Sequence, residues 1–469
     1  MKKHFKVLAS VLSVIMTIAI VAGCSVGRGR LDNNVGSDYD VELNVDKNIT
    51  AKLTIGVENY TAEKKIAGEI GDLLTKYYPN VTVEIKPFSG SLSSTVSGWY
   101  NANAMPDIFI NNSFDMFTLS DKNIMLDLTP YIQAEADETT EKNPDIPFNI
   151  DDYYDSYIKM GQENFDGAQY MMPRSADRVV CQYNVQIFKA AGVDMSLVKN
   201  GWTWDDFKQV CATLRAYYDA NGKENNHLID SYFTWEAVYN PIFEHFGVTY
   251  IEDSVAAINN DQTQEALDFI KSFIDERYVA PFSTSTANMA GGVGCILFHS
   301  QCASNTAASL AQNIDTSSAE KVSDYFNVVT MPVFSGDEKI GCGAAGYSVY
   351  SGSTNRDLAW IYLKLLMSKE GQNVMADSGS NYVPVRKDMA DYTDPENHWG
   401  IGYEDLNLSA YTYNPEWNCY TTYIAKAKPK QASNISNEIT KLISSYCAGT
   451  AFSTAANNCE NNINRFIKM

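Results

Sequence analysis

The chain has 469 residues, of which 57 are acidic and 36 basic, so its formal net charge is −21. Binding along a phosphate backbone needs clustered Lys and Arg, and this acidic excess argues against a nucleic-acid partner. A hydrophobic fraction of 45% is typical of globular proteins, and the length predicts several domains or two large lobes. Aromatic residues make up 12% of the chain, which indicates rings that line a cleft or surface as well as a core.

The N-terminus has the pattern of a secretory signal. A basic start is followed by an apolar run over residues 7–21, which is shorter than the roughly 20 residues that a membrane-spanning helix needs. The next segment, Val21-Ala22-Gly23-Cys24, resembles the lipobox of bacterial lipoproteins. This resemblance implies a signal peptide over residues 1–23 and lipidation of Cys24, with palmitate among the lipids. The protein would then be anchored at the extracellular face of the cell membrane.

The first half of the chain predicts a β-α-β unit behind a tether. Residues 24–48 are polar and are expected to link the lipid to the fold. Residues 51–57 alternate as a strand, an amphipathic helix follows from about residue 62, and residues 81–85 alternate again. A third short strand is expected at residues 107–110. The pattern therefore predicts a parallel sheet and an α/β fold.

The rest of the chain is mostly helical. Thr203 with Asp206 forms a capping-box sequence before an apolar stripe at residues 207–214. Similar stripes occupy residues 266–274, 358–366 and 435–446, and each predicts an amphipathic helix.

One glycine-rich motif is similar to a cofactor-binding sequence. Residues Gly341 to Gly346 read Gly-Cys-Gly-Ala-Ala-Gly, which matches the dinucleotide fingerprint. That fingerprint requires a helix immediately after the glycines, but the residues that follow alternate as a strand. We expect instead a glycine-rich turn that approaches a ligand or a neighbouring backbone.

The remaining chemistry-bearing residues predict no catalytic residue, cofactor or metal site. The five His are scattered, and the spacing of the eight Cys besides Cys24 matches no zinc site. These eight are expected to be mostly buried free thiols. A glycosidase pair among the many carboxylates stays open, although nothing singles out two of them.

Segments in a fixed order along the chain carry a family resemblance. They are Leu53–Val57 with Val81–Ile85, Pro106-Asp107-Ile108, Met125–Tyr131, Met172-Pro173 with Tyr183-Asn184 and Ala191-Gly192, Thr203–Phe207, Ala359–Leu363 and Val383–Val385. Together with the lipobox, they make the chain resemble a family 1 extracellular solute-binding protein. Members of this family are lipoprotein receptors of carbohydrate ABC transporters and are similar to maltose-binding protein.

The resemblance implies a fold and a mode of action. We expect a two-lobed, type II periplasmic-binding-protein-like α/β fold with three interlobe crossovers near residues 174–178, 330–333 and 383–387. The N-lobe would comprise residues 49–174 and 332–383, and the C-lobe residues 178–329 and 387–469. A monomer would close around a small-molecule carbohydrate and dock on membrane permease subunits served by a separate ATPase, with no enzymatic activity of its own.

The expected binding residues follow from the chemistry of sugars. An aromatic ring covers the apolar face of a sugar, while carboxylates, amides and Arg bind the hydroxyl rim. Such residues belong in loops at the carboxyl ends of strands and at the hinges. The candidates are Glu58, Asn59, Tyr60, Asn111, Asn112, Asp115, Arg174, Asp177, Tyr232, Trp235, Tyr239, Gly346, Tyr347 and Trp417.

Each candidate also has a purely structural interpretation. Glu58 and Asn59 could cap a helix, Trp235 and Tyr239 could share a core stripe, and Arg174 could pair with Asp177. Other solutes also stay open: a polyamine would suit carboxylates between aromatic walls, and a peptide or sugar phosphate is a further alternative. A surface polysaccharide hydrolase is the alternative from another class.

Overall fold

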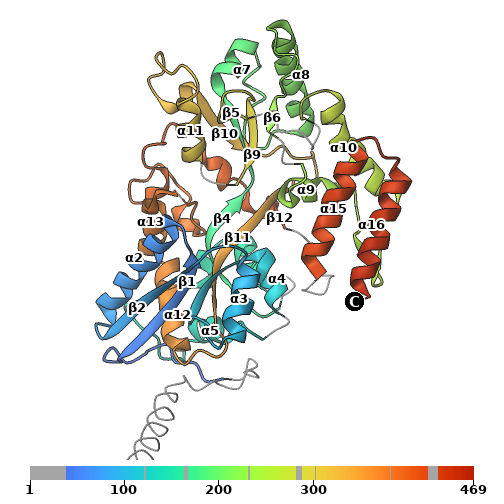
Figure 1. Cartoon of the computed structure of the whole chain (residues 1–469). Coiled ribbons are helices and arrows are strands. Elements are labelled where there is room, and N and C mark those ends of the chain that lie inside the picture. Colours follow the sequence, from blue (N-terminus) through green and yellow to red (C-terminus); the bar gives the residue numbers. More distant parts are fainter. Residues whose placement is uncertain are drawn as a thin grey trace, which may run out of the picture.

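The computed structural model describes residues 39–120, 123–162, 167–230, 233–280, 288–300, 303–380, 382–420 and 431–468. Figure 1 shows them as two lobes, with β4 (Met172–Arg178) and β11 (Ile340–Val349) in the region between. The predicted signal peptide, Cys24 and Tyr232 lie outside the described residues. Within these ranges, no helix combines the length and the apolar character needed to cross a membrane.

The N-lobe contains the predicted β-α-β unit. Strands β1 (Ala51–Glu58) and β2 (Val81–Phe88) pair in parallel, and β3 (Ile108–Asn112) joins the other side of β1. Helix α2 (Thr61–Tyr77) covers the sheet with a buried stripe that includes Ile66 and Ile70. The strand order is β12-β11-β3-β1-β2, with β4 added on β11. The predicted parallel sheet is confirmed, with antiparallel pairing where β11 enters it.

The C-lobe has a smaller sheet whose strand order is β10-β5-β9-β6. Its strands are β5 (Val180–Asn184), β6 (Ile229–Asp230), β9 (Ile296–His299) and β10 (Phe326–Thr330). Helix α8 (Trp204–Ala220) begins with the predicted capping box, in which Asp206 Oδ2 accepts from Thr203 N at 2.9 Å. Much of the aromatic surplus lies in this lobe's core: the Trp204 ring lies 5.6 Å from Phe207 and 5.6 Å from Phe273.

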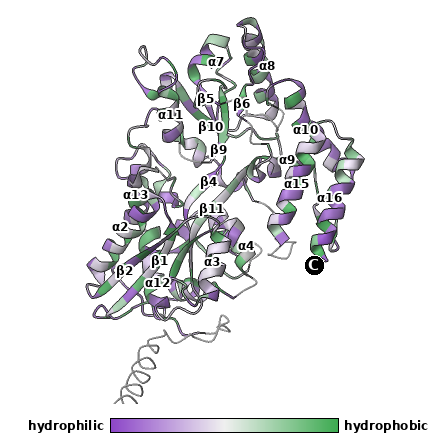
Figure 2. Ribbon diagram, in the orientation of Figure 1, coloured by the Kyte–Doolittle hydropathy of each residue, from purple (hydrophilic) through white to green (hydrophobic). Residues whose placement is uncertain are grey.

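Further helices pack against the two sheets, and Figure 2 shows their hydrophobic and hydrophilic residues. Those of the N-lobe are α3 (Leu92–Asn101), α4 (Ser113–Ser120), α5 (Thr129–Ala136), α6 (Asp155–Lys159), α12 (Arg356–Met367) and α13 (Lys369–Met375). Those of the C-lobe are α7 (Val185–Ala191), α9 (Glu236–His245), α10 (Asp261–Asp275), α11 (Ala303–Ala311), α15 (Ala432–Cys447) and α16 (Phe452–Ile467). A hairpin of β7 (Ile251–Glu252) and β8 (Val255–Ala256) and the edge strand β12 (Asn418–Cys419) complete the sheets.

The glycine motif forms part of β11 and not a turn. A Cβ on Gly346 would lie 2.1 Å from the carbonyl oxygen of Met172, and one on Gly341 would lie 1.6 Å from that of Ala237. The predicted close approach to a neighbouring backbone is therefore confirmed, while the predicted turn is wrong. The alternation of the residues after Gly346 is the end of the same strand.

The contacts place the lobe passages later in the chain than expected. In the first passage, β4 stays paired with β11 as far as Arg178. In the second, Val333 still belongs to the C-lobe, because its main chain exchanges hydrogen bonds with Trp202 and Trp204. In these two passages, the chain therefore leaves its lobe only beyond the end of a strand, which is β4 in the first passage and β10 in the second.

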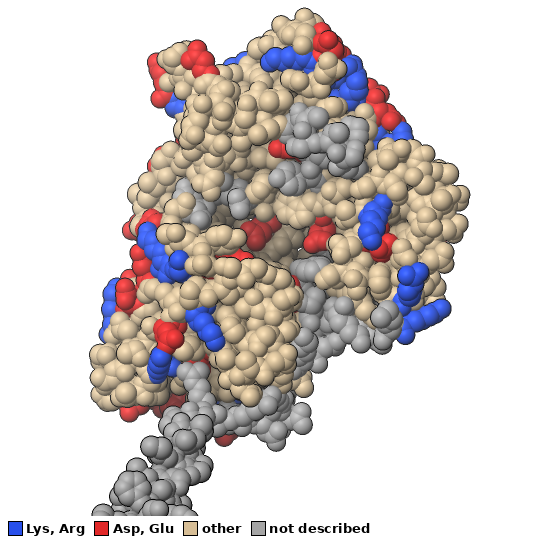
Figure 3. Space-filling model, viewed as in Figure 1, with Lys and Arg blue, Asp and Glu red and all other residues tan. Residues whose placement is uncertain are grey.

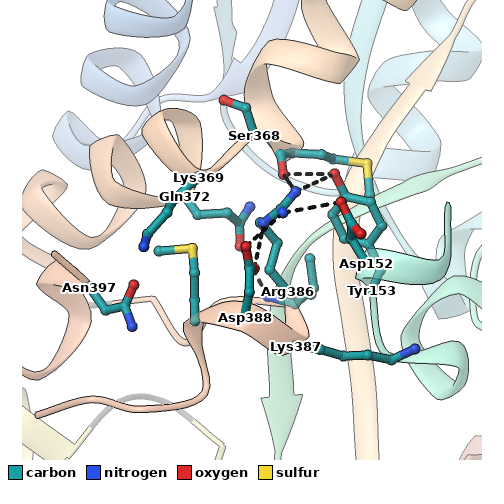
Figure 4. A network of polar contacts seen from close by, with 12 residues as sticks. Asp152, Tyr153, Ser368, Lys369, Gln372, Arg386, Lys387, Asp388 and Asn397 are labelled. Atoms are coloured by element: carbon teal, nitrogen blue, oxygen red, sulfur yellow. Dashed lines mark hydrogen bonds and ion pairs between the residues drawn. The ribbon is translucent and has the colours of Figure 1, made fainter. Parts of the chain in front are cut away.

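The third passage is displaced most. Arg386 donates to Tyr153 Oη at 3.1 Å and to Asp152 at 3.2 Å (Figure 4), which holds the expected crossover on the N-lobe. Further along, Asn373 of α13 donates to the carbonyl oxygen of Glu396 at 2.8 Å. Contact with the C-lobe follows at Asn407, whose main-chain N–H donates to Asn327 at 2.9 Å.

Part of the predicted tether belongs to the folded N-lobe. Leu43 and Val45 are buried, and the ring of Tyr39 lies 5.8 Å from that of Tyr131. Burial of these apolar side chains fixes the segment on the lobe. The prediction of a free tether up to residue 48 is therefore wrong for residues 39–48.

The seven described cysteines follow the prediction, while Cys302 lies outside the described residues. Cys181, Cys211, Cys295, Cys342, Cys419 and Cys459 are buried free thiols, and Cys447 is a half-buried one. No disulfide joins any of these seven described residues.

Candidate functional site

The floor of the candidate site is one face of the paired strands β4 and β11. Asp177 pairs with Gly343 in the register. A Cβ on Gly343 would point at Ser113 Oγ, 3.8 Å away in the N-lobe, whereas Gly341 on the same face meets α9 of the C-lobe. This face therefore looks into the space between α4 and α9. Figure 3 shows a hollow between the lobes with acidic side chains on its walls.

The N-lobe wall of the candidate site consists of the carboxyl ends of the parallel strands β1 and β3. Glu58 is half-buried at the end of β1, and Tyr60 is 65% exposed next to it. At the end of β3, the Asn112 amide donates to Asp115 at 2.8 Å, and Asp115 N donates back to Asn112 at 2.7 Å. Lys64 donates to Asn59 Oδ1 at 3.0 Å. Carboxylate, amide and aromatic groups therefore stand together on this wall.

The C-lobe wall begins at Trp235, which precedes α9. Its half-buried ring lies 6.4 Å from the ring of His299 at the end of β9. Glu236 follows and accepts from Ser436 of α15 at 2.8 Å. Burial raises the pKa of Glu236 and lowers that of His299, which favours the uncharged form of both groups.

A buried ion pair lies behind the floor. The Arg174 guanidinium pairs with Glu63 of α2, and the Arg174 and Glu63 side chains are only 5% and 4% exposed. Tyr382 Oη donates to the same carboxylate at 2.8 Å, and the Arg174 guanidinium lies 4.9 Å from the Tyr382 ring. Although burial acts in the opposite direction, Arg174 and these hydrogen bonds keep the pKa of Glu63 below its usual value. The partner of Arg174 is therefore Glu63 and not Asp177.

Asp177 is the most perturbed acid on the floor. Within the described residues its carboxylate has no hydrogen-bond partner, and burial raises its pKa to about 6 against the opposing effect of Arg174. A carboxylate held in this state destabilises the fold when it is ionised.

This raised pKa leads to a stability prediction for Asp177→Asn. Because the folded state holds the proton more tightly than the unfolded state, the free energy of unfolding falls as pH rises through about 4 to 6. We expect Asp177→Asn to be more stable than the parent at pH 7.5, by at most about 3 kcal/mol, and equal to it at pH 4. Urea unfolding at both pH values measures this difference, with exposed Asp72→Asn as the control. A less stable Asp177→Asn variant at pH 7.5 would contradict it.

Four candidates lie in buried places that favour structural roles. Asn111 is buried and donates to Ser348 Oγ at 2.9 Å. Tyr239 is buried with its ring 5.3 Å from Phe243, so the core-stripe interpretation fits it. Gly346 and Tyr347 are buried in β11. We expect Gly346 and Tyr347 to contact a ligand only if the glycine-rich motif forms a turn, and that turn does not form.

Trp417 lies on the opposite side of the crossing strands. Its ring is 5.5 Å from that of Tyr413, whose carbonyl oxygen accepts from Arg178. Because Arg178 and Asp177 are adjacent in β4, their side chains point to opposite faces. The geometry therefore favours a packing role for Trp417.

The sequence interpretation missed three residues near the site. From the sequence alone, Glu63 is an ordinary acidic residue in the first turn of a helix. Only the fold brings it to Arg174. Glu236 and Ser436 are 200 residues apart and meet only because α15 packs beside α9. The one usable signal was the pairing of Trp235 with an adjacent carboxylate at a helix start.

Comparison with known protein families gives a match over more than half of the chain. The model of the bacterial extracellular solute-binding proteins matches residues 70–401. The chain belongs to this family. No curated protein is detectably similar to this solute-binding protein.

Solved structures share its fold at low identity. The sugar-binding protein MalE from Xanthomonas citri superposes with a TM-score of 0.70 and 13% identity, covering 89% of this chain and 97% of that one. An ABC substrate-binding protein from Listeria monocytogenes in complex with cycloalternan gives a TM-score of 0.66 and 18% identity, covering 90% and 100%. A binding protein for cyclic α-maltosyl-1,6-maltose from Arthrobacter globiformis gives 0.67 and 18%, with the same coverage. The predicted type II periplasmic-binding-protein-like fold is confirmed.

Proposed function

We propose that this solute-binding protein captures a mono- or oligosaccharide between its lobes and delivers it to the permease of an ABC transporter. The observation that supports the proposal is the hollow between the lobes, which we infer to be bordered by the exposed Tyr60 ring, the half-buried Trp235 ring and carboxylates beside the paired strands β4 and β11. Rings cover the C–H face of a sugar, and carboxylates accept from its hydroxyl groups. Among the structural neighbours, one is in complex with cycloalternan and another is a binding protein for cyclic α-maltosyl-1,6-maltose.

The mode of action would be closure of the lobes around the solute. Contacts made from both lobes stabilise the closed state by the difference in affinity between closed and open forms. The protein would act as a monomer, without an enzymatic step, and a separate ATPase subunit would supply the energy. The lipidated Cys24 would keep it at the extracellular face of the membrane.

A thermal-shift screen of the purified mature chain against mono- and oligosaccharides tests the function. A saccharide that binds only the folded protein raises its melting temperature. Product analysis of the same mixtures separates a receptor from a hydrolase, since a receptor returns the glycan uncleaved. A screen with no stabilising saccharide would contradict the proposal.

Trp235 supplies a mutational test of the site. Trp235→Ala removes a ring from the C-lobe wall and should weaken binding of the best saccharide by roughly tenfold or more, while Trp235→Phe should retain most of the affinity. Trp417→Ala serves as the matched control on the opposite side of the strands and should change affinity less than twofold. Titration calorimetry measures both. If Trp417→Ala weakened binding more than Trp235→Ala, the site would lie on the other side of β4 and β11.

A further inference from the structure

Helix α15 contacts the short segment of the C-lobe wall that carries Trp235. Ser436 Oγ donates to Glu236 Oε2 at 2.8 Å. One turn later, Thr440 Oγ1 donates to the carbonyl oxygen of Thr234 at 3.3 Å. Because Ser436 and Thr440 are four residues apart, they lie on one face of α15. The two hydrogen bonds therefore hold the chain on both sides of Trp235.

The sequence around Trp235 provides no side-chain cap of its own. Trp235 precedes the first turn of α9 with an extended backbone, at φ −86° and ψ 130°. Side chains that cap a helix at this position accept a hydrogen bond from the first turn, but an indole can only donate. Among the described residues, Ser436 is also the only one that hydrogen-bonds the Glu236 carboxylate. The hydrogen bonds that replace a local cap therefore come from α15.

Helix α15 is itself a fixed support. Its apolar stripe, which includes Ile435 and Ile439, is buried. Glu438 is buried as well and accepts from Asn462 of α16 at 2.8 Å. In addition, α15 lies beside α4 of the N-lobe (Figure 1). The support for Trp235 therefore stands where the two lobes approach each other.

We propose that Ser436 is a positioning residue for solute binding, which holds Glu236 and thereby sets the orientation of the Trp235 ring, with Thr440 as a second, weaker support. The inference rests on the proposed function and adds to its binding site a residue that acts through its neighbours. A ring that is oriented in advance loses less side-chain freedom when the solute binds. For one side chain, this saving corresponds to roughly two- to tenfold in affinity.

The same hydrogen bond acts on the charge of Glu236. Burial raises the pKa of Glu236, and the hydroxyl of Ser436 acts in the opposite direction. Without this hydroxyl, the ionised carboxylate loses its stabilising donor, and we expect the half-buried side chain to turn toward water. Ser436→Ala therefore releases the segment and does not simply leave it in place.

The first test observes the Trp235 ring directly and needs no solute. The mature chain labelled with 5-fluorotryptophan gives a fluorine NMR resonance for each of its seven tryptophans, and Trp235→Phe identifies the relevant one. We expect Ser436→Ala to shift or broaden this resonance, and Ser436→Thr, which keeps the hydroxyl, to leave it near the parent position. Ser445→Ala is the matched control, because the Ser445 hydroxyl donates within α15 to the carbonyl oxygen of Leu442 at 3.1 Å. An unchanged resonance of the buried Trp360 in the N-lobe verifies that each variant is folded.

The second test measures the consequence for binding. Titration calorimetry at pH 7.5 would use maltose, cellobiose and the saccharide with the largest thermal shift. We expect Ser436→Ala to weaken binding by roughly two- to tenfold and Thr440→Val to weaken it less, while Ser436→Thr and Ser445→Ala stay within twofold of the parent. In a Trp235→Ala background, Ser436→Ala should change the affinity less than twofold, because the ring that Ser436 positions is gone. A general loss of stability would lower the affinity in both backgrounds.

The outcomes separate this inference from the proposed function. A Trp235 resonance or a saccharide affinity that Ser436→Ala leaves unchanged would overturn the positioning role. An equal loss of affinity with and without the Trp235 ring would overturn it too. Each of these results leaves the receptor function standing. If no saccharide binds to the parent protein, the proposed function fails, and Ser436 has no part in solute binding whatever the NMR spectra show.

Discussion

Gly341→Ala is expected to destabilise the protein by about 3 kcal/mol or more. The new methyl group would lie 1.6 Å from the carbonyl oxygen of Ala237 and 2.5 Å from its carbonyl carbon. Both atoms belong to backbone, so α9 must move away from β11 at the junction of the lobes. We expect the melting temperature to fall by more than about 5 °C, as scanning calorimetry can measure.

Gly343→Ala provides the matched control for this clash. The two glycines lie in the same strand two residues apart, and neither has a positive φ. Among the described residues, a Cβ on Gly343 would have only Ser113 Oγ within 4 Å, at an ordinary 3.8 Å. We expect Gly343→Ala to unfold near the parent temperature. Equal destabilisation by both variants would show that strand propensity, and not contact with α9, makes glycine necessary.

Arg174→Met should also cost about 3–5 kcal/mol of stability at pH 7, because it leaves Glu63 buried without its cation. Since Arg174 depresses the pKa of Glu63, the stability from this pair is present above the unfolded pKa and is lost as pH falls through the folded pKa. The difference in the free energy of unfolding between parent and variant should therefore become smaller in acid. Urea unfolding at pH 7 and pH 3 measures it.

An exposed ion pair is the control for this experiment. Lys76 and Glu370 approach to 3.2 Å with side chains 62% and 57% exposed, and such pairs contribute less than about 1 kcal/mol. Lys76→Ala should therefore leave the stability nearly unchanged. If Arg174→Met lost as little stability as Lys76→Ala, the buried pair would contribute no more than a surface pair.

Local patterns carried most of the N-lobe prediction. Alternation at residues 51–57 and 81–85, with an amphipathic helix between, determines a parallel unit because few other arrangements bury both faces. The prediction of the Thr203–Asp206 cap also depended on a local pattern. The glycine motif was harder, because alternation of side chains cannot distinguish a turn before a strand from a strand that contains small residues.

The candidate site depends on contacts that no local pattern contains. Asp177 and Gly343 are opposite each other because β4 and β11 pair across 166 residues of sequence. Glu63 was recognisable only as a helix-start residue until α2 packed beside Arg174. The lobe passages were displaced for the same reason, since the hydrogen bonds that hold residues 386–396 on the N-lobe come from α13 and from Tyr153.

Small-angle X-ray scattering tests the central claim most directly. The purified mature chain would be measured alone and with a saturating concentration of the saccharide that gives the largest thermal shift. Closure of the lobes around the solute predicts a smaller radius of gyration in the bound sample. An identical scattering profile with and without a saccharide that demonstrably binds would contradict closure.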